Sequence, residues 1–179
     1  MSGIEALGLE SGTVRVVPYD PRWPLLFKEA AAALRQAIGP ELIAIHHVGS
    51  TAVPGLPAKP ILDILVAIPH FERGRSLVPR LAALGYEHRP DEDIPDRHYF
   101  RRRSGTTRTH HVSLAEPGSH HHRVTLAFRD ALRRFPELAE QYAVLKAGLA
   151  AQYPRNREAY LEGKSAFVCR VLSVVDTVS

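Results

Sequence analysis

The chain has 179 residues, 45% of them hydrophobic, with no compositional shift that would mark a domain boundary, so one domain is expected. The single Cys169 excludes an internal disulfide and a cysteine-built zinc site, which favours a reducing, cytoplasmic location. No window reaches the roughly 20 apolar residues of a membrane span, so no membrane partner is expected. The formal charge of +4 is mild; it suits a phosphate-bearing small molecule or a weak nucleic-acid contact, but such a surplus usually serves solubility, and nucleic acid is not expected as a partner.

Strand and helix patterns alternate along the first two thirds of the chain, and the last third is predicted to be helical. Residues 1–12 are expected to be a flexible segment, and 13–179 a single domain. Apolar periodicity and turn residues predict a strand at 13–17, a helix at 21–38, strands at 42–48 and 61–68, a short helix at 75–84, a hairpin of strands at 97–103 and 107–114, and helices at 120–135, at 136–153 and near the C-terminus. This order indicates an α/β fold.

The segment from His46 to Val66 carries the sharpest chemical signal. Gly49 and Ser50 follow an apolar strand directly, and Asp63 lies inside the next one. A carboxylate in a buried strand needs a compensating cation, metal or hydrogen-bond set, so Asp63 is a candidate functional residue. A Gly-Ser turn lets backbone approach a phosphate closely, and the hydroxyls of Ser50 and Thr51 can bind it, with Lys59 adding positive charge. The alternative is a plain loop beside a structural aspartate.

The run VGSTAVPGLPAKPILDILV closely resembles the signature of the GrpB (UPF0157-type) family, whose fold belongs to the nucleotidyltransferase superfamily. The segments VVPYDPRWPLLFKEAA, FRDALRRFPELAEQYAVLKAGLA and YLEGKSAFVCRVL are similar to the same family, so the resemblance covers residues 14 to 175. It implies a mixed β-sheet flanked by α-helices. It also implies that Gly49 and Ser50 hold nucleotide phosphates, and that Asp63 binds a divalent metal, magnesium or manganese, as the catalytic carboxylate.

The chain departs from the superfamily at its acidic residues. A second acid normally follows two positions after the first, on the same strand face, but that position is Leu65 here. The strand that should supply a third acid, at 109–114, offers histidine and serine instead. Two-metal catalysis needs several carboxylates, and Asp63 alone does not supply them.

Histidines could form a different metal site. In this alternative, His47, His98 and His111 join Asp63 as ligands for zinc or another transition metal. The competing interpretation is that these histidines are ordinary surface or hydrogen-bonded residues. Arg129 and Arg133 lie on one helix face and, with Lys146 and Lys164, are second-tier candidates for the pocket; an internal ion pair is the other interpretation of the helix charges.

Three hypotheses follow from these residues. The first is a metal-dependent nucleotidyltransferase with an unknown acceptor, in which Asp63 holds the metal. The second is a catalytically inactive module of the same fold that binds a nucleotide or another phosphate-bearing small molecule. The third is a transition-metal protein built on Asp63 and the three histidines.

Overall fold

The computed structural model describes residues 6–178, with side chains through Val174. Its centre is a mixed β-sheet in the order β2-β3-β6-β5-β4, with β1 paired to β6 off this path. The β3 and β6 strands are parallel, whereas the other pairs are antiparallel. The strands are β1 (Leu9–Glu10), β2 (Ala44–Val48), β3 (Leu62–Ala67), β4 (Tyr86–His88), β5 (His98–Ser104) and β6 (Thr107–Ala115).

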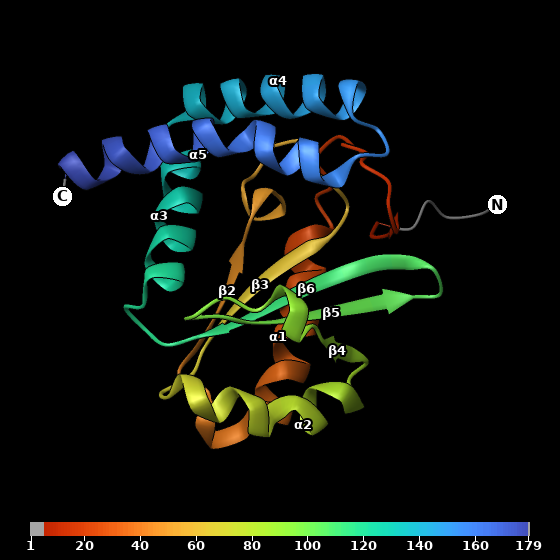
Figure 1. Ribbon diagram of the computed structural model, residues 1–179, viewed down its shortest axis with the longest axis vertical. Coiled ribbons are helices and arrows are strands. Elements are labelled where there is room, and N and C mark those ends of the chain that lie inside the picture. The colour runs from red at the N-terminus through yellow and green to blue at the C-terminus, as the bar shows by residue number, and fades with distance from the viewer. Residues whose placement is uncertain (1–5, 179) are drawn as a thin grey trace.

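Two helices, α1 (Trp23–Ile38) and α2 (Val78–Ala83), cover one face of the sheet (Figure 1). Alternate residues of the central strands point to this face and form the largest core cluster with Leu34 of α1 and Leu81 of α2. Ile64 and Val112 are members of this cluster. Residues of opposite parity on the same strands, including Asp63, therefore face the other side.

The other side is occupied by α3 (His120–Arg134), α4 (Pro136–Gln152) and α5 (Arg157–Val178). Leu126 of α3 packs against Val48, Leu65 and Ala115 of the sheet. The α4 and α5 helices run side by side at the top of Figure 1 and bury an apolar cluster against the loop that contains Val53 and Leu56. No helix in the described part of the chain, including the 22-residue α5, has the length and apolarity needed to cross a membrane.

The mixed α/β architecture with a helical last third is confirmed, and several local predictions are corrected. The strand predicted at 13–17 is wrong: Val17 forms only an isolated bridge to Ala58, and the following Pro18 has no N–H to extend a ladder. Leu9 and Glu10, in the segment expected to be flexible, pair with β6, while residues 1–5 lie outside the described residues. The short helix expected at 75–84 is split into the 3₁₀ helix η3 (Phe71–Leu77) and α2, and β4 was not predicted.

Candidate functional site

The Gly49 turn is built against the Asp63 side chain. In the β2–β3 pair, Val48 lies opposite Asp63, and Gly49 ends the strand with φ 71° and ψ −173°. Only glycine adopts this backbone conformation routinely. A Cβ atom at position 49 would lie 2.5 Å from Asp63 Oδ2. Backbone conformation and lack of space therefore both require glycine here, and the short 3₁₀ helix η2 (Ser50–Ala52) follows it.

Asp63 pairs with His111 across the parallel β3–β6 ladder. His111 Nδ1 lies 3.0 Å from Asp63 Oδ1, so the imidazole N–H donates to the carboxylate. Burial opposes ionisation, but the hydrogen bond from His111 and the charges of Lys59 and Lys164 outweigh it and hold the pKa of Asp63 below its ordinary value. The Asp63 side chain is 42% exposed, because it opens into a cavity within the fold.

That cavity has a volume of about 310 Å³ and lies between the sheet edge, η2, α4 and α5. Its charged side chains are one carboxylate, from Asp63, and four basic groups, from Lys59, Lys146, Lys164 and Arg157. The chain has 19 arginines but only four lysines, and three of those four line this one cavity. The pKa of a lysine side chain shifts on burial, whereas an arginine side chain stays charged. The gathering of lysines therefore gives this cavity basic groups that differ chemically from the arginines elsewhere.

Lys146 of α4 is the most buried of these lysines, at 2% exposure. Its Nζ donates to Ser50 Oγ at 3.0 Å and to the carbonyl oxygen of Pro57, which ties α4 to the Gly-Ser turn. Burial, followed by the charges of Lys164 and Lys59, lowers the pKa of Lys146 to about 7. The ammonium is thus held close to the phosphate-binding candidate Ser50 at an energetic cost that a bound anion would relieve.

Lys59 and Lys164 both contact the aromatic ring of Tyr160, with Nζ-to-centroid distances of 5.2 and 4.8 Å. Burial, with a contribution from the charge of Lys164, lowers the pKa of Lys59 to about 8. Burial also raises the pKa of the Tyr160 phenol to about 12, so its hydroxyl remains protonated. This hydroxyl is buried and has no hydrogen-bond partner among the described residues. Tyr160 is also a lining residue of the cavity, where its ring contacts the two lysines.

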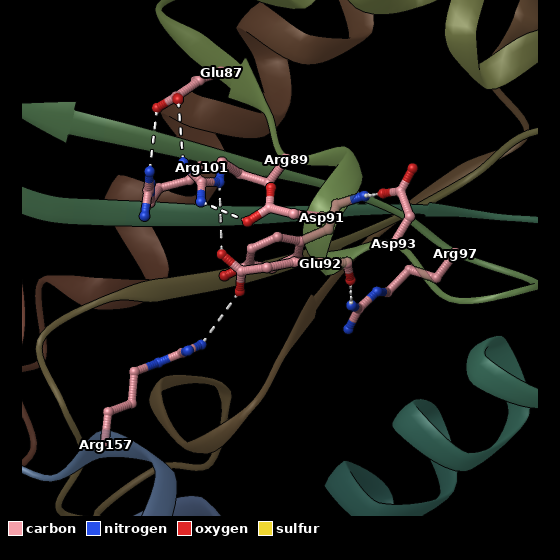
Figure 2. Close-up of polar contacts among 9 residues, drawn as sticks. Glu87, Arg89, Asp91, Glu92, Asp93, Arg97, Arg101 and Arg157 are labelled. Carbon is pink, nitrogen blue, oxygen red and sulfur yellow. Dashed lines mark hydrogen bonds and ion pairs between the residues drawn. The ribbon is translucent and has the colours of Figure 1, made fainter.

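Arg157 comes from the first turn of α5 and is positioned by an acidic partner. Its Nη2 lies 3.5 Å from Glu92 Oε2, and Glu92 also lies 3.6 Å from Arg89 Nε. Figure 2 shows Glu92 between these two arginines, with Arg157 extending from α5 toward the strands. The start of α5 is therefore linked to the β4–β5 edge of the sheet by charge.

The structure brings together most of the predicted phosphate-binding residues. The lining of the cavity includes Gly49, Ser50, Thr51, Lys59, Asp63, His111, Lys146 and Lys164. Within this set the Thr51 hydroxyl is already engaged, because its Oγ1 lies 2.9 Å from His47 Nε2. The Ser50 hydroxyl is engaged as well, but its partner is Lys146, a cation that could bind the same phosphate.

Two predicted histidine ligands do not reach Asp63. His47 pairs with Ile64 and so points to the opposite face, where its ring stacks on Phe27. His98 pairs with Leu114, also on the opposite face, and contacts Asp93 instead. The site of Asp63 with three histidines therefore does not form, because the strand register places His47 and His98 on the sheet face opposite Asp63.

Two predicted arginines brace the backbone outside the cavity. Arg129 Nη1 donates to the carbonyl oxygen of His47 at 3.0 Å, and Arg133 Nε donates to that of Ala52 at 2.9 Å. Arg129 also forms an ion pair with its neighbour Asp130. These contacts hold α3 against the end of β2 and against η2.

Tyr142, Tyr160 and Arg157 line the cavity but were not predicted from the sequence. The spacing of the two tyrosines from nearby lysines in the sequence could have indicated them. Tyr142 and Lys146 are four residues apart on α4, Tyr160 and Lys164 are four apart on α5, and this spacing places each pair on one helix face. In both pairs the lysine Nζ lies over the tyrosine ring.

The mixed sheet carries the Gly-Ser turn after β2 and Asp63 on β3, the arrangement expected of a nucleotidyltransferase-like fold. In agreement, the fold is similar to that of the Cid1 poly(U) polymerase bound to MgATP, with a TM-score of 0.51 at 12% identity over 78% of this chain and 44% of that chain. The chain belongs to the GrpB family, because the profile of the GrpB protein matches residues 13–173.

Individual relatives agree with this assignment. The solved structure of the conserved protein GrpB from Enterococcus faecalis gives a TM-score of 0.83 at 34% identity and covers 90% of this chain and 96% of that one. The glutamate-rich protein GrpB of Alkalihalophilus pseudofirmus is 31% identical over 93% of this chain and 98% of its own length. The UPF0157 protein YqkA of Bacillus subtilis is 39% identical over 87% of this chain, which spans only 45% of that relative's length.

Proposed function

We propose that the cavity binds the phosphate groups of a nucleotide or another phosphate-bearing small molecule. The observation that carries this proposal is the gathering of Lys59, Lys146, Lys164 and Arg157 around a single carboxylate. Burial and mutual repulsion disfavour the charged forms of these lysines, and a bound polyanion would stabilise them. Ser50 adds a hydrogen-bonding group for phosphate oxygens.

The size of the cavity supports the phosphate portion of a ligand as its occupant. Its volume of about 310 Å³ is at the lower end of the about 300–1,000 Å³ typical of small-molecule sites. A phosphate chain or a small phosphorylated metabolite fits this volume. The nucleoside part of a nucleotide would extend beyond the lysines toward solvent.

A pair of magnesium or manganese ions does not fit this donor set. Asp63 is the only carboxylate among the lining residues, and it accepts a hydrogen bond from His111. Leu65, at the position of the second acid, is fully buried beneath α3. Since two metal ions need several anionic oxygens, the buried lysines supply the positive charge here instead.

One observation favours turnover as a second candidate function. The Asp63 carboxylate fixes the imidazole of His111 through Nδ1, which leaves Nε2 as the other functional nitrogen of a residue that lines the cavity. A carboxylate-oriented imidazole is a common general base. In this candidate function, His111 Nε2 would take a proton from an acceptor that attacks one phosphate of a bound nucleotide, and the phosphoanhydride bond would break to release the remaining phosphates.

Calorimetric titration tests phosphate binding directly. ATP, GTP, CTP, UTP and inorganic triphosphate are titrated into the protein, once with magnesium and once with EDTA. We expect binding under both conditions, because the cations of the site are side chains. Absence of heat with every ligand would refute the proposal, and binding that requires magnesium would refute the role given to the lysines.

Matched variants locate the binding to this cavity. Lys146→Met and Lys164→Met should each weaken binding by about tenfold to a hundredfold, as expected for loss of one charged hydrogen bond. Lys28→Met, which changes the exposed fourth lysine on α1, should leave affinity unchanged.

Transfer chemistry is tested separately. Radiolabelled nucleotide is incubated with the protein and cell extract, and a labelled product that is lost in His111→Asn and Asp63→Asn supports turnover. Binding without any labelled product identifies the protein as a phosphate-binding module.

A further inference from the structure

A second polar cluster lies on the opposite face of the sheet from Asp63. It consists of His88 at the end of β4, Asp93 after the 3₁₀ helix η4 (Pro90–Glu92), and His98 at the start of β5. His88 and His98 sit on neighbouring antiparallel strands, and the connection between those strands carries Asp93 back between them. Three side chains capable of metal ligation thus converge at one corner of the fold.

The ligand atoms of these residues lie close together. His88 Nε2 is 3.0 Å and His98 Nδ1 is 3.1 Å from the same oxygen, Asp93 Oδ2, and all three atoms lie within 4.8 Å of one another. Ligands of a tetrahedral zinc ion, bound at about 2.0–2.1 Å, are separated by about 3.3 Å. The three side chains are 4–16% exposed, so the cluster is largely shielded from solvent.

In its neutral form, His98 has one nitrogen without a suitable protein partner. Nε2 lies 3.0 Å from the carbonyl oxygen of Phe71, which can only accept, so Nε2 carries the ring proton. In the neutral imidazole, Nδ1 then presents a lone pair to the Asp93 carboxylate, which is also an acceptor. A positive charge between Nδ1 and Oδ2, from a second ring proton or from a metal ion, removes this conflict.

The surroundings hold the cluster in the geometry of a ligand set. The His98 ring stacks on Phe71 at a centroid distance of 4.0 Å, and a Cβ at Gly74 would collide with its Cδ2. Asp93 Oδ1 accepts a hydrogen bond from the backbone N–H of Tyr99 at 2.7 Å. Bonds of this kind, from a histidine to a carbonyl and to the free oxygen of a carboxylate, orient metal ligands in protein sites.

We propose that His88 Nε2, His98 Nδ1 and Asp93 Oδ2 bind one divalent transition-metal ion of the zinc class. Two imidazoles and one carboxylate favour such an ion over magnesium or calcium, which prefer all-oxygen ligands. A cavity of about 550 Å³, lined by Asp93, His98, Phe71 and Glu72 among others, adjoins the cluster. It leaves room for a water molecule or a small ligand as the fourth ligand of the metal. This site is independent of the phosphate-binding cavity.

Metal analysis of untagged protein tests this proposal. Protein stripped with a chelator is dialysed against zinc and then against metal-free buffer, and its zinc content is measured. We expect one zinc per chain, a rise of several degrees in Tm, and, with cobalt in place of zinc, visible absorption bands of a four-coordinate site. His88→Gln and Asp93→Asn should reduce retained metal to below about a tenth per chain.

Two control variants distinguish this cluster from other sources of binding. His120→Gln with His122→Gln removes histidines of the α3 run that could capture metal adventitiously, and Asp63→Asn removes the carboxylate of the other cavity. Both should retain zinc. Loss of zinc in either control but not in His88→Gln would overturn the assignment, as would a folded wild-type chain that retains no metal. If the variants of the cluster fail to fold, X-ray absorption spectroscopy of the zinc-loaded wild type provides the test. Two imidazole ligands in the zinc coordination shell would support the site, and a shell without them would exclude it.

Discussion

Gly49 is the residue on which the geometry of the phosphate-binding cavity depends. Its backbone conformation is open to glycine alone, and a side chain there would collide with Asp63. We expect Gly49→Ala to lower the free energy of unfolding by about 2–4 kcal/mol, from backbone strain and steric overlap together. It should also displace the Asp63 carboxylate and weaken phosphate binding. Urea denaturation and calorimetric titration measure the two effects.

Gly105→Ala is the matched control for this prediction. Gly105 also has a positive φ, of 58°, but it lies at the tip of the β5–β6 hairpin, and a Cβ added there would have no neighbouring atom within 4 Å. Its substitution should cost only about 1 kcal/mol and leave phosphate binding intact. Equal losses in the two variants would show that the close approach of Gly49 to Asp63 has no special role.

At the level of elements, helix α3 covers the sheet position next to Asp63 where the superfamily has a second acid. Leu65 shares a sheet face with Asp63, but Leu126 of α3 covers it and its exposure is 0%. We expect Leu65→Asp, which restores the acid typical of the superfamily, to lower the free energy of unfolding by roughly 4 kcal/mol or more, since it buries a charge in an apolar cluster. Chemical denaturation and a transfer assay with magnesium provide the measurement.

Leu65→Met changes the same position with nearly the same volume and no charge. It should cost less than about 1.5 kcal/mol. A stable Leu65→Asp variant that gains magnesium-dependent transfer activity would contradict the view that α3 has closed this position to a metal ligand.

Periodicity and turn residues were sufficient to predict the longer elements. The strands β2, β3, β5 and β6 and all three C-terminal helices lie close to their predicted positions. Apolar runs mark β2 and β3, and turn or cap residues mark other ends, such as Ser119 before α3 and Pro136 at the start of α4. The two-residue β1 and three-residue β4 are too short for any periodicity to register, and they form by pairing with strands distant or downstream in sequence. Such pairing is not encoded locally.

The candidate site was predictable only in part, for a related reason. Gly49, Ser50, Lys59 and Asp63 lie within 15 residues, so one motif identifies them together. The face to which His47 points depends on its pairing with Ile64, and a shift of one residue would reverse it. Tyr142, Arg157 and Tyr160 reach the cavity only through the packing of α4 and α5 on the rest of the fold.

For the molecule as a whole, the buried lysines predict stability that increases with pH. The pKa of Lys146 is about 7 in the folded chain, against 10.5 as its ordinary value. Between these values the unfolded chain binds more protons, so raising the pH favours the folded state. We expect the free energy of unfolding of ligand-free protein to gain on the order of 2 kcal/mol from Lys146 between pH 7 and pH 9.

Urea denaturation of wild type and Lys146→Met at pH 7, 8 and 9 isolates this contribution. The free energy of unfolding of the wild type should rise with pH relative to that of Lys146→Met, whereas Lys28→Met should follow the wild type. Parallel curves for wild type and Lys146→Met would contradict the lowered pKa. Bound phosphate would draw the lysine back toward its charged form, so binding at pH 8 should take up protons from the buffer.

The scarcity of lysine gives the cavity a distinct covalent reactivity. A lysine whose pKa is about 7 is close to half neutral at physiological pH, and the neutral amine is a nucleophile. Lys59, with a pKa of about 8, shares this character to a smaller degree. Because the chain has only one lysine outside the cavity, a small uncharged aldehyde would react with these neutral amines and form an imine there, with loss of water. The pocket is thus suited to being labelled by a small uncharged carbonyl compound, while the arginine side chains of the surface stay unmodified.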